Sequence, residues 1–353
     1  MEYPLVSVVI PVYNMEPFLG ETLDSVLASD YPSLEVVVLD DGSVDASYAL
    51  ARQYAEKDGR VHVYTQLNMG VSAARNRAIS LAKGEFILPV DADNKISREF
   101  IHNAVNVILQ DEEVKVVSPR AEFFGNRSGE WKLPPFSLKL LARKNIMDTC
   151  ALYRKSDWER VGGYNEDIIA REDWEFWIAL LKDGGKVIKL PDVSLYYRVR
   201  SNSKRMTDRS QKKHVINVLN QRHPDFFERE LGGPLRYRRT WSQLINKAYR
   251  LFHPSVSLVG ENYVDFSYWV KALPFCFGDS FGSLIYKGRN ELREYNYKGK
   301  DLVIKSFAKP NLINRIVYGL FRSSKAQRSY EYADMLLKAG IGTPEPVSYT
   351  HLT

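Results

Sequence analysis

The sequence predicts an α/β fold built on a mostly parallel β-sheet. Three apolar, β-branched runs end in polar residues, in the segments 6–14, 35–43 and 86–93. Runs of this kind are typical of parallel strands that are buried on both faces. Helical patterns alternate with these runs over short connections, which is the arrangement that covers both faces of such a sheet.

The predicted elements follow one another regularly through the first half of the chain. Apolar residues of the segment 17–28 recur at helical spacing, Ser43 is a candidate cap for the next helix, and Gly84 ends a third helix. Glycine and proline interrupt the pattern between residues 122 and 148, where we expect loops. The pattern predicts helices at 17–28, 46–57, 70–83 and 97–110, further strands at 61–64, 85–90 and 114–118, and helical segments at 155–160 and 174–182.

The length and composition indicate a globular protein of two domains. A chain of 353 residues favours about two domains, and its character changes near residue 254, so we expect domains at 1–254 and 255–353. Cys150 and Cys276 lie far apart and indicate no disulfide framework, which favours a reducing compartment. No run approaches the ~18 consecutive apolar residues of a membrane span, and the first strand begins too early for a signal peptide. We therefore expect a cytoplasmic protein.

The net charge of +6 is concentrated in one segment. Residues 195–250 carry fourteen Lys and Arg side chains against four Asp and Glu side chains. This basic segment is either a solvated helical face or a surface for anionic partners, namely phosphates, nucleic acid or an anionic membrane. Because no recognised nucleic-acid motif accompanies it, we expect no nucleic-acid partner and keep peripheral contact with the inner face of the membrane as an alternative.

Polar and aromatic side chains follow the predicted strands at the points where the strands end. These side chains belong to Tyr13, Asp41, Asp91 and Asp93. Ligands of open α/β sheets bind at the carboxyl ends of the strands, so we expect these side chains to lie along one crevice. An aromatic ring, an acidic hydrogen-bond acceptor and a D-x-D pair suit a base, a ribose and a metal-bound diphosphate. The sequence therefore predicts a nucleotide-sugar site.

A known family shares these motifs in the same order. Over residues 4–254 the chain resembles the family 2 glycosyltransferases, with Asp40-Asp41-Gly42-Ser43, Asp91-Ala92-Asp93 and the segment 171–177 as the most specific matches. The resemblance implies the GT-A fold of nucleotide-diphospho-sugar transferases and an inverting, metal-dependent transfer with Mn²⁺ or Mg²⁺ as cofactor. It also implies that Asp93 is the metal ligand and that Asp91 lies nearer the ribose. For the D-x-D pair alone, a turn that caps the next helix explains the pattern equally well.

The resemblance also implies how the nucleotide is held. Asp41 would accept a hydrogen bond from the imide N–H of uracil, while Tyr13 packs on the base and Pro11 lines the same wall. Uracil N3 carries a proton and cytosine N3 does not, so a carboxylate at this place favours a UDP donor. Arg75 is a candidate for contact with the donor or with the carboxylates of the metal site. Asp40 has an alternative role, which is to cap the following helix.

The segment 171–177, with the sequence REDWEFW, supplies the predicted catalytic acids. The resemblance assigns the general base to Asp173, and Glu172 would orient the acceptor. Burial among the tryptophans that follow would raise the pKa of Asp173 toward the working pH. The segment 197–203 resembles the part of the family that closes over the diphosphate, which Arg198 can contact in a bidentate manner. The sequence shows neither the Q-x-x-R-W motif nor the membrane helices of a processive synthase, so we expect addition of a single sugar.

The last hundred residues resemble a second family. Segments between residues 284 and 331 are similar to the start of the lipopolysaccharide (Kdo/heptose) kinases, which have a protein-kinase-like fold. In such a fold, a lysine on the third strand and a glutamate on the following helix hold the phosphates of ATP, and the resemblance assigns these roles to Lys305 and Glu331. No catalytic-loop Asp and no D-F-G motif follow Lys305. We therefore expect residues 255–353 to form a truncated, inactive α+β N-lobe.

The leading hypothesis is a cytoplasmic glycosyltransferase that moves one sugar from a nucleotide-diphospho-sugar to a cell-envelope glycan or glycolipid, such as lipopolysaccharide. The envelope context rests on the kinase-like segment. One alternative is a non-catalytic scaffold at the inner face of the membrane, which would use the basic segment 195–250. Another is a fragment of a bifunctional glycosyltransferase and lipopolysaccharide kinase.

Overall fold

The chain forms two units in the computed structural model. The structure describes residues 3–200, 208–252, 255–259, 282–288, 290–297, 299–307 and 325–351, together with Phe266 and Phe277. The first unit comprises Met1–Ser242 and the second unit Gln243–Thr353. The assignment of residues 1–254 and 255–353 to a transferase domain and a kinase-like domain stays a prediction.

The first unit is built on one sheet, which runs in the order β3-β2-β1-β4-β8-β6-β9-β5, with β7 paired to β6. The pairs β1–β2, β2–β3, β1–β4 and β6–β9 are parallel, whereas β5, β7 and β8 pair antiparallel with their neighbours. The predicted α/β fold with a mostly parallel sheet is therefore confirmed. The strands are β1 (Val6–Val12), β2 (Leu34–Asp40), β3 (Val61–Thr65), β4 (Phe86–Pro89), β5 (Lys95–Ile96), β6 (Val114–Gly125), β7 (Gly129–Trp131), β8 (Leu152–Arg154) and β9 (Lys186–Val199).

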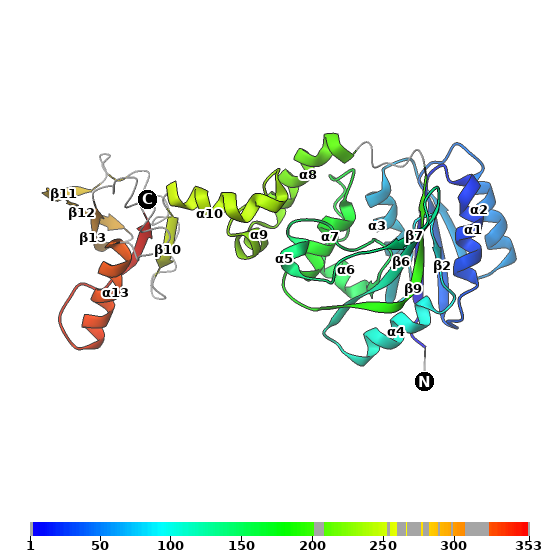
Figure 1. Cartoon of the computed structure of the whole chain (residues 1–353), viewed down its shortest axis with the longest axis horizontal. Coiled ribbons are helices and arrows are strands. Elements are labelled where there is room, and N and C mark those ends of the chain that lie inside the picture. Colours follow the sequence, from blue (N-terminus) through cyan, green and yellow to red (C-terminus); the bar gives the residue numbers. More distant parts are fainter. Residues whose placement is uncertain are drawn as a thin grey trace. The chain divides into compact units, whose positions relative to one another are not determined.

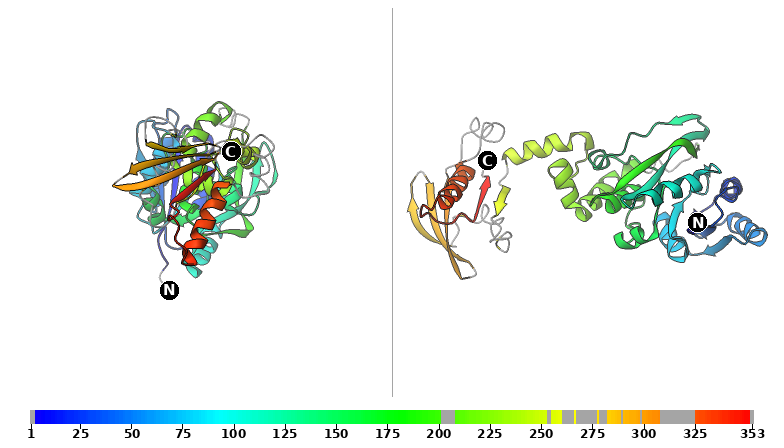
Figure 2. Two further views of the ribbon diagram at one scale, coloured as in Figure 1. Left: turned by 90° about the vertical axis from the view of Figure 1, so that its left-hand side faces the viewer. Right: turned by 90° about the horizontal axis from the view of Figure 1, so that it is seen from below.

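Helices cover both faces of this sheet (Figures 1 and 2). Alternate residues of β1 enter different cores. Val8 belongs to the core that includes buried residues of α1, α2 and α4, whereas Val9 belongs to the core that includes those of α3, α5, α7, α8 and α9. Burial on both faces explains why the strands are continuous apolar runs rather than alternating patterns. The helices are α1 (Glu16–Leu27), α2 (Ser47–Lys57), α3 (Val71–Leu81), α4 (Phe100–Gln110), α5 (Leu138–Leu141), α6 (Lys155–Val161), α7 (Glu172–Leu181), α8 (Asp208–Arg222) and α9 (Pro224–Leu231).

The expectation of loops from residue 122 onward was wrong at its start. Strand β6 continues to Gly125, and β7 turns back along it. The cause is non-local pairing, because Phe123 and Phe124 lie in register with Tyr197 and Arg198 of β9. Local turn signals do not report such a pairing. Only the remainder of the interval, apart from the short helix α5, is irregular.

The second unit contains two helices and two small antiparallel sheets among its described residues. It begins with α10 (Ser242–Phe252), whose first residue closes the first unit. Strand β10 (Ser255–Val259) pairs with β14 (Ser348–His351). A meander of β11 (Ser283–Lys287), β12 (Asn290–Tyr297) and β13 (Lys300–Phe307) precedes α13 (Lys325–Lys338).

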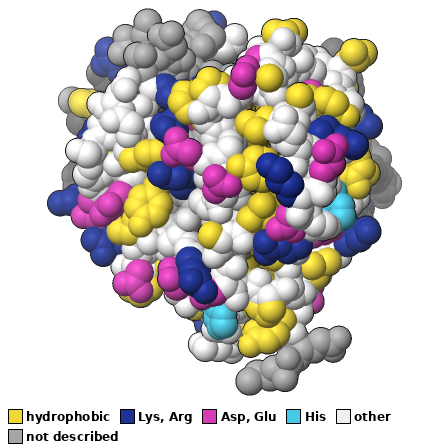
Figure 3. All heavy atoms as spheres, turned by 90° about the vertical axis from the view of Figure 1, so that its right-hand side faces the viewer, with side chains coloured by type: hydrophobic (Ala, Val, Ile, Leu, Met, Phe, Trp, Pro, Cys, Tyr) yellow, Lys and Arg dark blue, Asp and Glu magenta, His cyan; other side chains and the backbone are white. Residues whose placement is uncertain are grey.

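Two further features concern the charges on the surface of the first unit and the length and apolar character of the helices. On the face of the first unit seen in Figure 3, basic and acidic side chains are interspersed. Within the described ranges, no helix has both the length and the apolar character that crossing a membrane requires.

Candidate active site

The carboxyl ends of β1, β2 and β4 meet at one edge of the sheet. Val12 is in register with Asp40, and the backbone N–H of Asp41 donates to the Val12 carbonyl at 2.8 Å. On the other side of β1, the N–H of Val90 donates to the Val9 carbonyl at 3.0 Å. The loops that follow these three strands therefore start side by side, as the argument from strand ends predicted.

Asp41 holds the loop between β3 and α3 at this edge. Its side chain is buried, and Oδ1 accepts from Gln66 Nε2 at 2.8 Å and from the Met69 N–H at 2.9 Å. Its Oδ2 accepts from the N–H of Gly70 at 2.9 Å. A carboxylate has about four acceptor positions, so at least one is left for a ligand. The contact of Asp41 with uracil stays a prediction.

Tyr13 is an exposed residue at the end of β1, the strand that pairs with β2, after which Asp41 lies. The residue is 44% exposed and directly follows β1, on which Pro11 is half-buried. Asp40 has a structural role, since its Oδ2 accepts from the Ser43 N–H at 3.2 Å and from Thr65 Oγ1 at 3.3 Å. These bonds fix the turn after β2, so an exposed aromatic ring stands next to a fixed acidic turn.

The D-x-D acids lie in the loop after β4. Asp93 is mostly buried, and its Oδ2 lies 2.9 Å from Nε of Arg200. Burial raises the pKa of Asp93 to about 6, and the charge of Asp91 adds to this effect. The alternative that this pair caps the next helix is wrong, because β5 intervenes and α4 begins at Phe100 without a side-chain cap. A capping role thus does not account for the two acids.

Arg75 joins the D-x-D acids to the acids of α7. Its guanidinium is buried, with Nη2 at 2.7 Å from Asp91 Oδ1 and Nη1 at 2.6 Å from Glu172 Oε1. The ring of Tyr164 lies 5.5 Å from the guanidinium carbon. Of the two roles proposed for Arg75, the structure places it against carboxylates; its contact with a nucleotide stays a prediction. The neighbouring Asn76 binds the turn at residues 164–166.

Asp173 lies in the first turn of α7, where the helix dipole favours negative charge. Its Oδ2 accepts from Asn145 Nδ2 at 2.6 Å, and its Oδ1 accepts from the backbone N–H of Trp174 at 2.8 Å. Burial raises the pKa of Asp173 to about 7, with further contributions from the charges of Glu172 and Asp148, while Arg75 opposes the shift. A carboxyl group with this pKa is suited to accept a proton near neutral pH.

The aromatic residues of α7 are core residues. Trp174, Phe176 and Trp177 are buried, and Phe176 stacks on the ring of Tyr164 at 4.2 Å between centroids. The Trp174 Nε1–H donates to the Leu141 carbonyl at 2.7 Å. These contacts fix α7, and with it the acids of its first turn, on the sheet.

Arg198 and Arg200 close the other side of the D-x-D loop. Arg198 stacks on Phe124 at 4.3 Å, and its Nε donates to the backbone carbonyl of Asp93 at 2.9 Å. Its Nη2 lies 3.1 Å from Glu21 Oε2, so the guanidinium is already engaged by protein groups. The contact of Arg198 with a diphosphate stays a prediction. The end of the segment 197–203, from residue 201 onward, lies outside the described residues.

Two site residues escaped the sequence analysis. Arg200 faces Asp93, and a signal for it exists: it lies two residues after Arg198 at the end of a strand, a spacing that brings side chains to the same face. Asn145 faces Asp173 from the irregular segment after α5, and no pattern in the sequence marks it.

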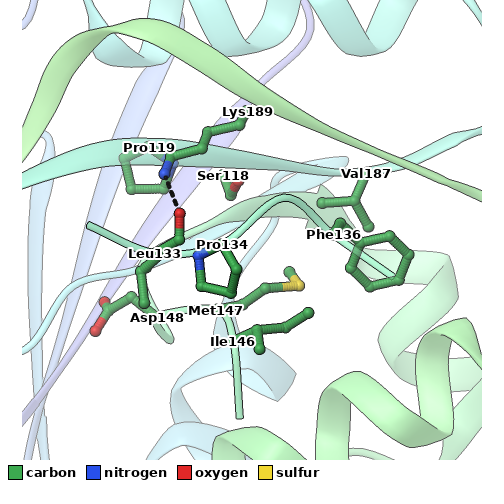
Figure 4. A pocket seen from close by; sticks show the side chains of 10 residues that line it. All are labelled: Ser118, Pro119, Leu133, Pro134, Phe136, Ile146, Met147, Asp148, Val187 and Lys189. Carbon is green, nitrogen blue, oxygen red and sulfur yellow. Dashed lines mark hydrogen bonds between the residues drawn. The ribbon is translucent and has the colours of Figure 1, made fainter. Parts of the chain in front are cut away.

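A small cavity is lined in part by Asp148, an acid close enough to Asp173 to interact with it electrostatically. Its volume is about 40 Å³, and two residues that line it are joined by a hydrogen bond from Lys189 Nζ to the Leu133 carbonyl at 3.4 Å. In Figure 4 the Asp148 carboxylate points away from the apolar side chains around it. Burial raises the pKa of Asp148 to about 7, assisted by the charge of Asp91. The lining residues are Ser118, Pro119, Leu133, Pro134, Phe136, Ile146, Met147, Asp148, Val187 and Lys189.

The residues at the D-x-D loop fit a divalent cation of the hard type. Such ions take carboxylate oxygens, often from one or two acids, and complete their shell with water and substrate phosphates. Asp91 and Asp93 offer these oxygens at the edge where a diphosphate would lie, and Asp91 is 32% exposed. Across the residues that the structure describes, no group of three or more acidic, histidine or cysteine side chains forms a complete metal cage.

Lys305 and Glu331, the two residues assigned to the predicted kinase-like lobe, make contacts with different partners. Lys305 on β13 is exposed, and its Nζ lies 5.1 Å from the centroid of the Phe307 ring. Glu331 on α13 is also exposed and accepts from Gln327 Nε2 at 2.8 Å. In the described part of this unit, no ion pair joins the lysine to the glutamate.

Comparison with known proteins decides the family. The model of "Glycosyl transferase family 2" matches residues 7–162. The putative teichuronic acid biosynthesis glycosyltransferase TuaG of Bacillus subtilis is 30% identical over 206 residues, which cover 57% of this chain and 81% of TuaG. The chain belongs to glycosyltransferase family 2. A second relative, the uncharacterized glycosyltransferase EpsJ of B. subtilis, is 31% identical over 219 residues, or 57% of this chain, but the match spans less than two thirds of EpsJ, at 62%.

Solved structures show the same fold as this family 2 chain. TarS of Staphylococcus aureus in complex with UDP-GlcNAc has a TM-score of 0.52 and 20% identity, over 70% of this chain and 80% of the other. The mannosyltransferase PcManGT of Pyrobaculum calidifontis, in complex with GDP-Man and Mn²⁺, has a TM-score of 0.50 and 22% identity, over 71% and 75%. At these identities the likeness shows the GT-A fold alone. A kinase-like fold of the second unit is not shown by these comparisons.

Proposed function

We propose that the first unit transfers one sugar from a UDP-sugar to a hydroxyl group of a cell-envelope glycan, with inversion at the anomeric carbon. One observation carries the proposal: Arg75 links Asp91 of the D-x-D loop to Glu172 beside the buried Asp173. The proposed site of the sugar donor and the carboxylate of the proposed general base, Asp173, are thereby held at a fixed separation. That arrangement suits direct displacement, in which acceptor, anomeric carbon and leaving group must be aligned.

The proposed reaction is a single displacement. The acceptor oxygen forms a bond to the anomeric carbon while the bond from that carbon to the diphosphate oxygen breaks. The hydroxyl proton passes to the carboxylate of Asp173, and the electron pair of the broken bond leaves with UDP. The raised pKa of Asp173, about 7, makes it an effective proton acceptor near neutrality. Glu172 would orient the acceptor from the adjacent position.

The donor would lie along the edge formed by β1, β2 and β4. Tyr13 would pack on the base, with Pro11 on the same wall and Asp41 accepting from the uracil imide. Asp91 would contact the ribose, and Arg198 would contact the diphosphate. The exposure of Tyr13 and the free acceptor capacity of Asp41 support this arrangement. That TarS has been solved with UDP-GlcNAc on the same fold also supports a UDP donor.

The cofactor in this proposal is a divalent cation, Mn²⁺ or Mg²⁺, held by Asp93 with Asp91 in support. When bound, it would supply positive charge to the leaving diphosphate. The carboxylate donor set supports this choice, as does the Mn²⁺ in the PcManGT complex. Within the protein, Arg200 adds a second positive charge at the same carboxylate.

The acceptor is proposed from the name of a relative, and the cellular location of the reaction from the basic segment of the chain. TuaG carries a name that refers to teichuronic acid biosynthesis. We place the reaction in the cytoplasm, at the inner face of the membrane, with lipopolysaccharide or another surface polysaccharide as the product. The basic segment 195–250 supports peripheral contact with anionic lipid.

The test compares Asp173→Asn with Asp167→Asn, an exposed acid shortly before α7. Release of UDP from a panel of UDP-sugars is measured with and without added glycan acceptors. The proposal predicts that the first variant loses at least about a hundredfold in rate, the usual contribution of a general base, while the control keeps its rate. Full turnover by Asp173→Asn would refute the assignment of the base.

A second candidate function concerns the second unit alone. A three-stranded antiparallel meander with Lys305 on its last strand is followed by a helix that carries Glu331. This order supports a kinase-like nucleotide-binding lobe within a longer bifunctional chain. Binding of ATP to the wild-type chain that is lost in Lys305→Met would support it, and equal binding would refute it. Strong binding to anionic liposomes without any sugar turnover would instead favour the scaffold.

A further inference from the structure

Asn145 makes the shortest side-chain contact of Asp173. Its Nδ2 lies 2.6 Å from Asp173 Oδ2, which is slightly shorter than the usual N–H···O hydrogen bond. The other carboxylate oxygen, Oδ1, accepts from the backbone N–H of Trp174 at 2.8 Å. Each oxygen therefore has one fixed donor, and each keeps acceptor capacity for a further proton.

The orientation of the Asn145 amide follows from its two partners. Its Oδ1 accepts from the backbone N–H of Met147 at 3.2 Å, and this N–H can only donate. The amide oxygen must therefore face Met147, which turns the NH₂ group toward Asp173. The opposite orientation would place an amide oxygen against a carboxylate and an NH₂ group against an N–H.

The segment that carries Asn145 is fixed at both of its ends. Before it, the Leu141 carbonyl accepts from Trp174 Nε1 at 2.7 Å, which ties the segment to α7. After it, Ile146 and Met147 are buried in the core of the first unit. Asn145 is thus held by contacts that do not depend on Asp173, so its donor is in place before a substrate arrives.

We propose that Asn145 is a positioning residue for the general base: it holds the Asp173 carboxylate in one rotation and stabilises its ionised form. The proposal rests on the proposed function of Asp173. An amide N–H donates but cannot accept, so the bond is strong to a carboxylate and weaker to the neutral acid. Asn145 thereby opposes the burial that would otherwise keep Asp173 protonated, and it does so without adding a titrating group.

Four charged or titratable groups face Asp173 from the elements packed on it. Glu172 from α7 and Asp148 from the segment before β8 repel its charge, whereas Arg75 from α3 attracts it. The Tyr164 hydroxyl is also within electrostatic range. Two acids therefore oppose ionisation against one cation, and two neutral donors, the Asn145 amide and the backbone N–H of Trp174, favour the anion.

The test measures the stability of the full chain against pH, so it needs no substrate. Urea unfolding is followed at pH 5.5, 7.0 and 8.5 for the wild type and for Asn145→Leu. Asp173 has a raised pKa in the folded state, so its ionisation costs stability as the pH rises through that value. Loss of the Asn145 hydrogen-bond donor must increase the stability that is lost when Asp173 ionises. The expected result is a small destabilisation at pH 5.5 that grows to about a tenfold or greater change in the unfolding equilibrium constant at pH 8.5.

Two further variants keep the test decisive. Asn145→Asp has nearly the same shape and puts a carboxylate against Asp173, so its loss of stability must grow more steeply with pH. In an Asp173→Asn background, the pH-dependence caused by Asn145→Leu must disappear. Asn106→Leu, at an exposed position of α4, is the matched control and must show no growth with pH.

The possible outcomes separate this inference from the proposed function. A destabilisation of equal size at all three pH values, or one that persists unchanged in the Asp173→Asn background, would overturn the role of Asn145. A pH-dependent loss that needs Asp173 supports it. Full activity of Asp173→Asn in the transfer assay is a different result. It would show that Asp173 is not the general base, but it would leave the pH-dependent coupling between Asn145 and Asp173 intact.

Discussion

Replacement of Arg75 by methionine removes the buried positive charge of the site while keeping a side chain of similar length. The guanidinium is only 4% exposed, and it balances Asp91 and Glu172 through bonds of 2.7 and 2.6 Å. Removal of one partner from a buried ion pair costs about 3–5 kcal/mol, because the other charge is left without compensation. Asp91 is 32% exposed and regains water, so we expect the lower end, about 3 kcal/mol.

The assay is urea and thermal unfolding of Arg75→Met beside Arg77→Met, which makes the same substitution at an exposed position of the same helix. For a unit of this size, about 3 kcal/mol corresponds to a loss of about 6–12 °C in Tm, while the control should stay within about 0.5 kcal/mol of the wild type. The cost should shrink in Arg75→Met/Glu172→Gln, where one of the abandoned charges is removed. Equal stability of the two single variants would refute the view that Arg75 compensates buried acids.

Three further predictions concern other parts of the first unit. Glu175→Gln should destabilise it by about 2–3 kcal/mol, because the buried carboxylate accepts from Arg222 Nε at 2.9 Å and from His223 Nε2 at 2.7 Å; an unchanged urea midpoint would contradict this. Gly163→Ala should cost about 2 kcal/mol, since φ is +76° and a Cβ would lie 2.6 Å from an amide oxygen, and circular dichroism melts can detect the loss. The rate of transfer should rise as the pH increases through about 7, where Asp173 ionises; a rate that falls over that range in wild-type protein would argue against a carboxylate base.

The strands that build the site could be predicted because each is a local signal. Strands β1, β2 and β4 are apolar runs that end in polar residues, and the rule that parallel strands present ligands at their carboxyl ends then placed Tyr13, Asp41 and Asp91 at one edge. The tryptophans on α7 are buried, which agrees with the usual place of such large apolar side chains.

The features that escaped prediction depend on contacts between distant parts of the chain. Arg75 bonds to residues 16 and 97 positions away, so its spacing in sequence could not choose between its two candidate roles. The extension of β6 depends on its pairing with β9, and the place of Asn145 depends on how an irregular segment crosses the start of α7. Local propensity contains none of this information, because tertiary pairing determines it.

The most direct test of the account is metal-dependent turnover of a panel of UDP-sugars, with wild-type protein and Asp93→Ala measured in parallel in the presence of Mn²⁺ or Mg²⁺. The account predicts that one donor is turned over, that turnover requires the cation, and that it disappears in the variant. Folded wild-type protein that neither binds UDP nor turns over any donor would contradict it.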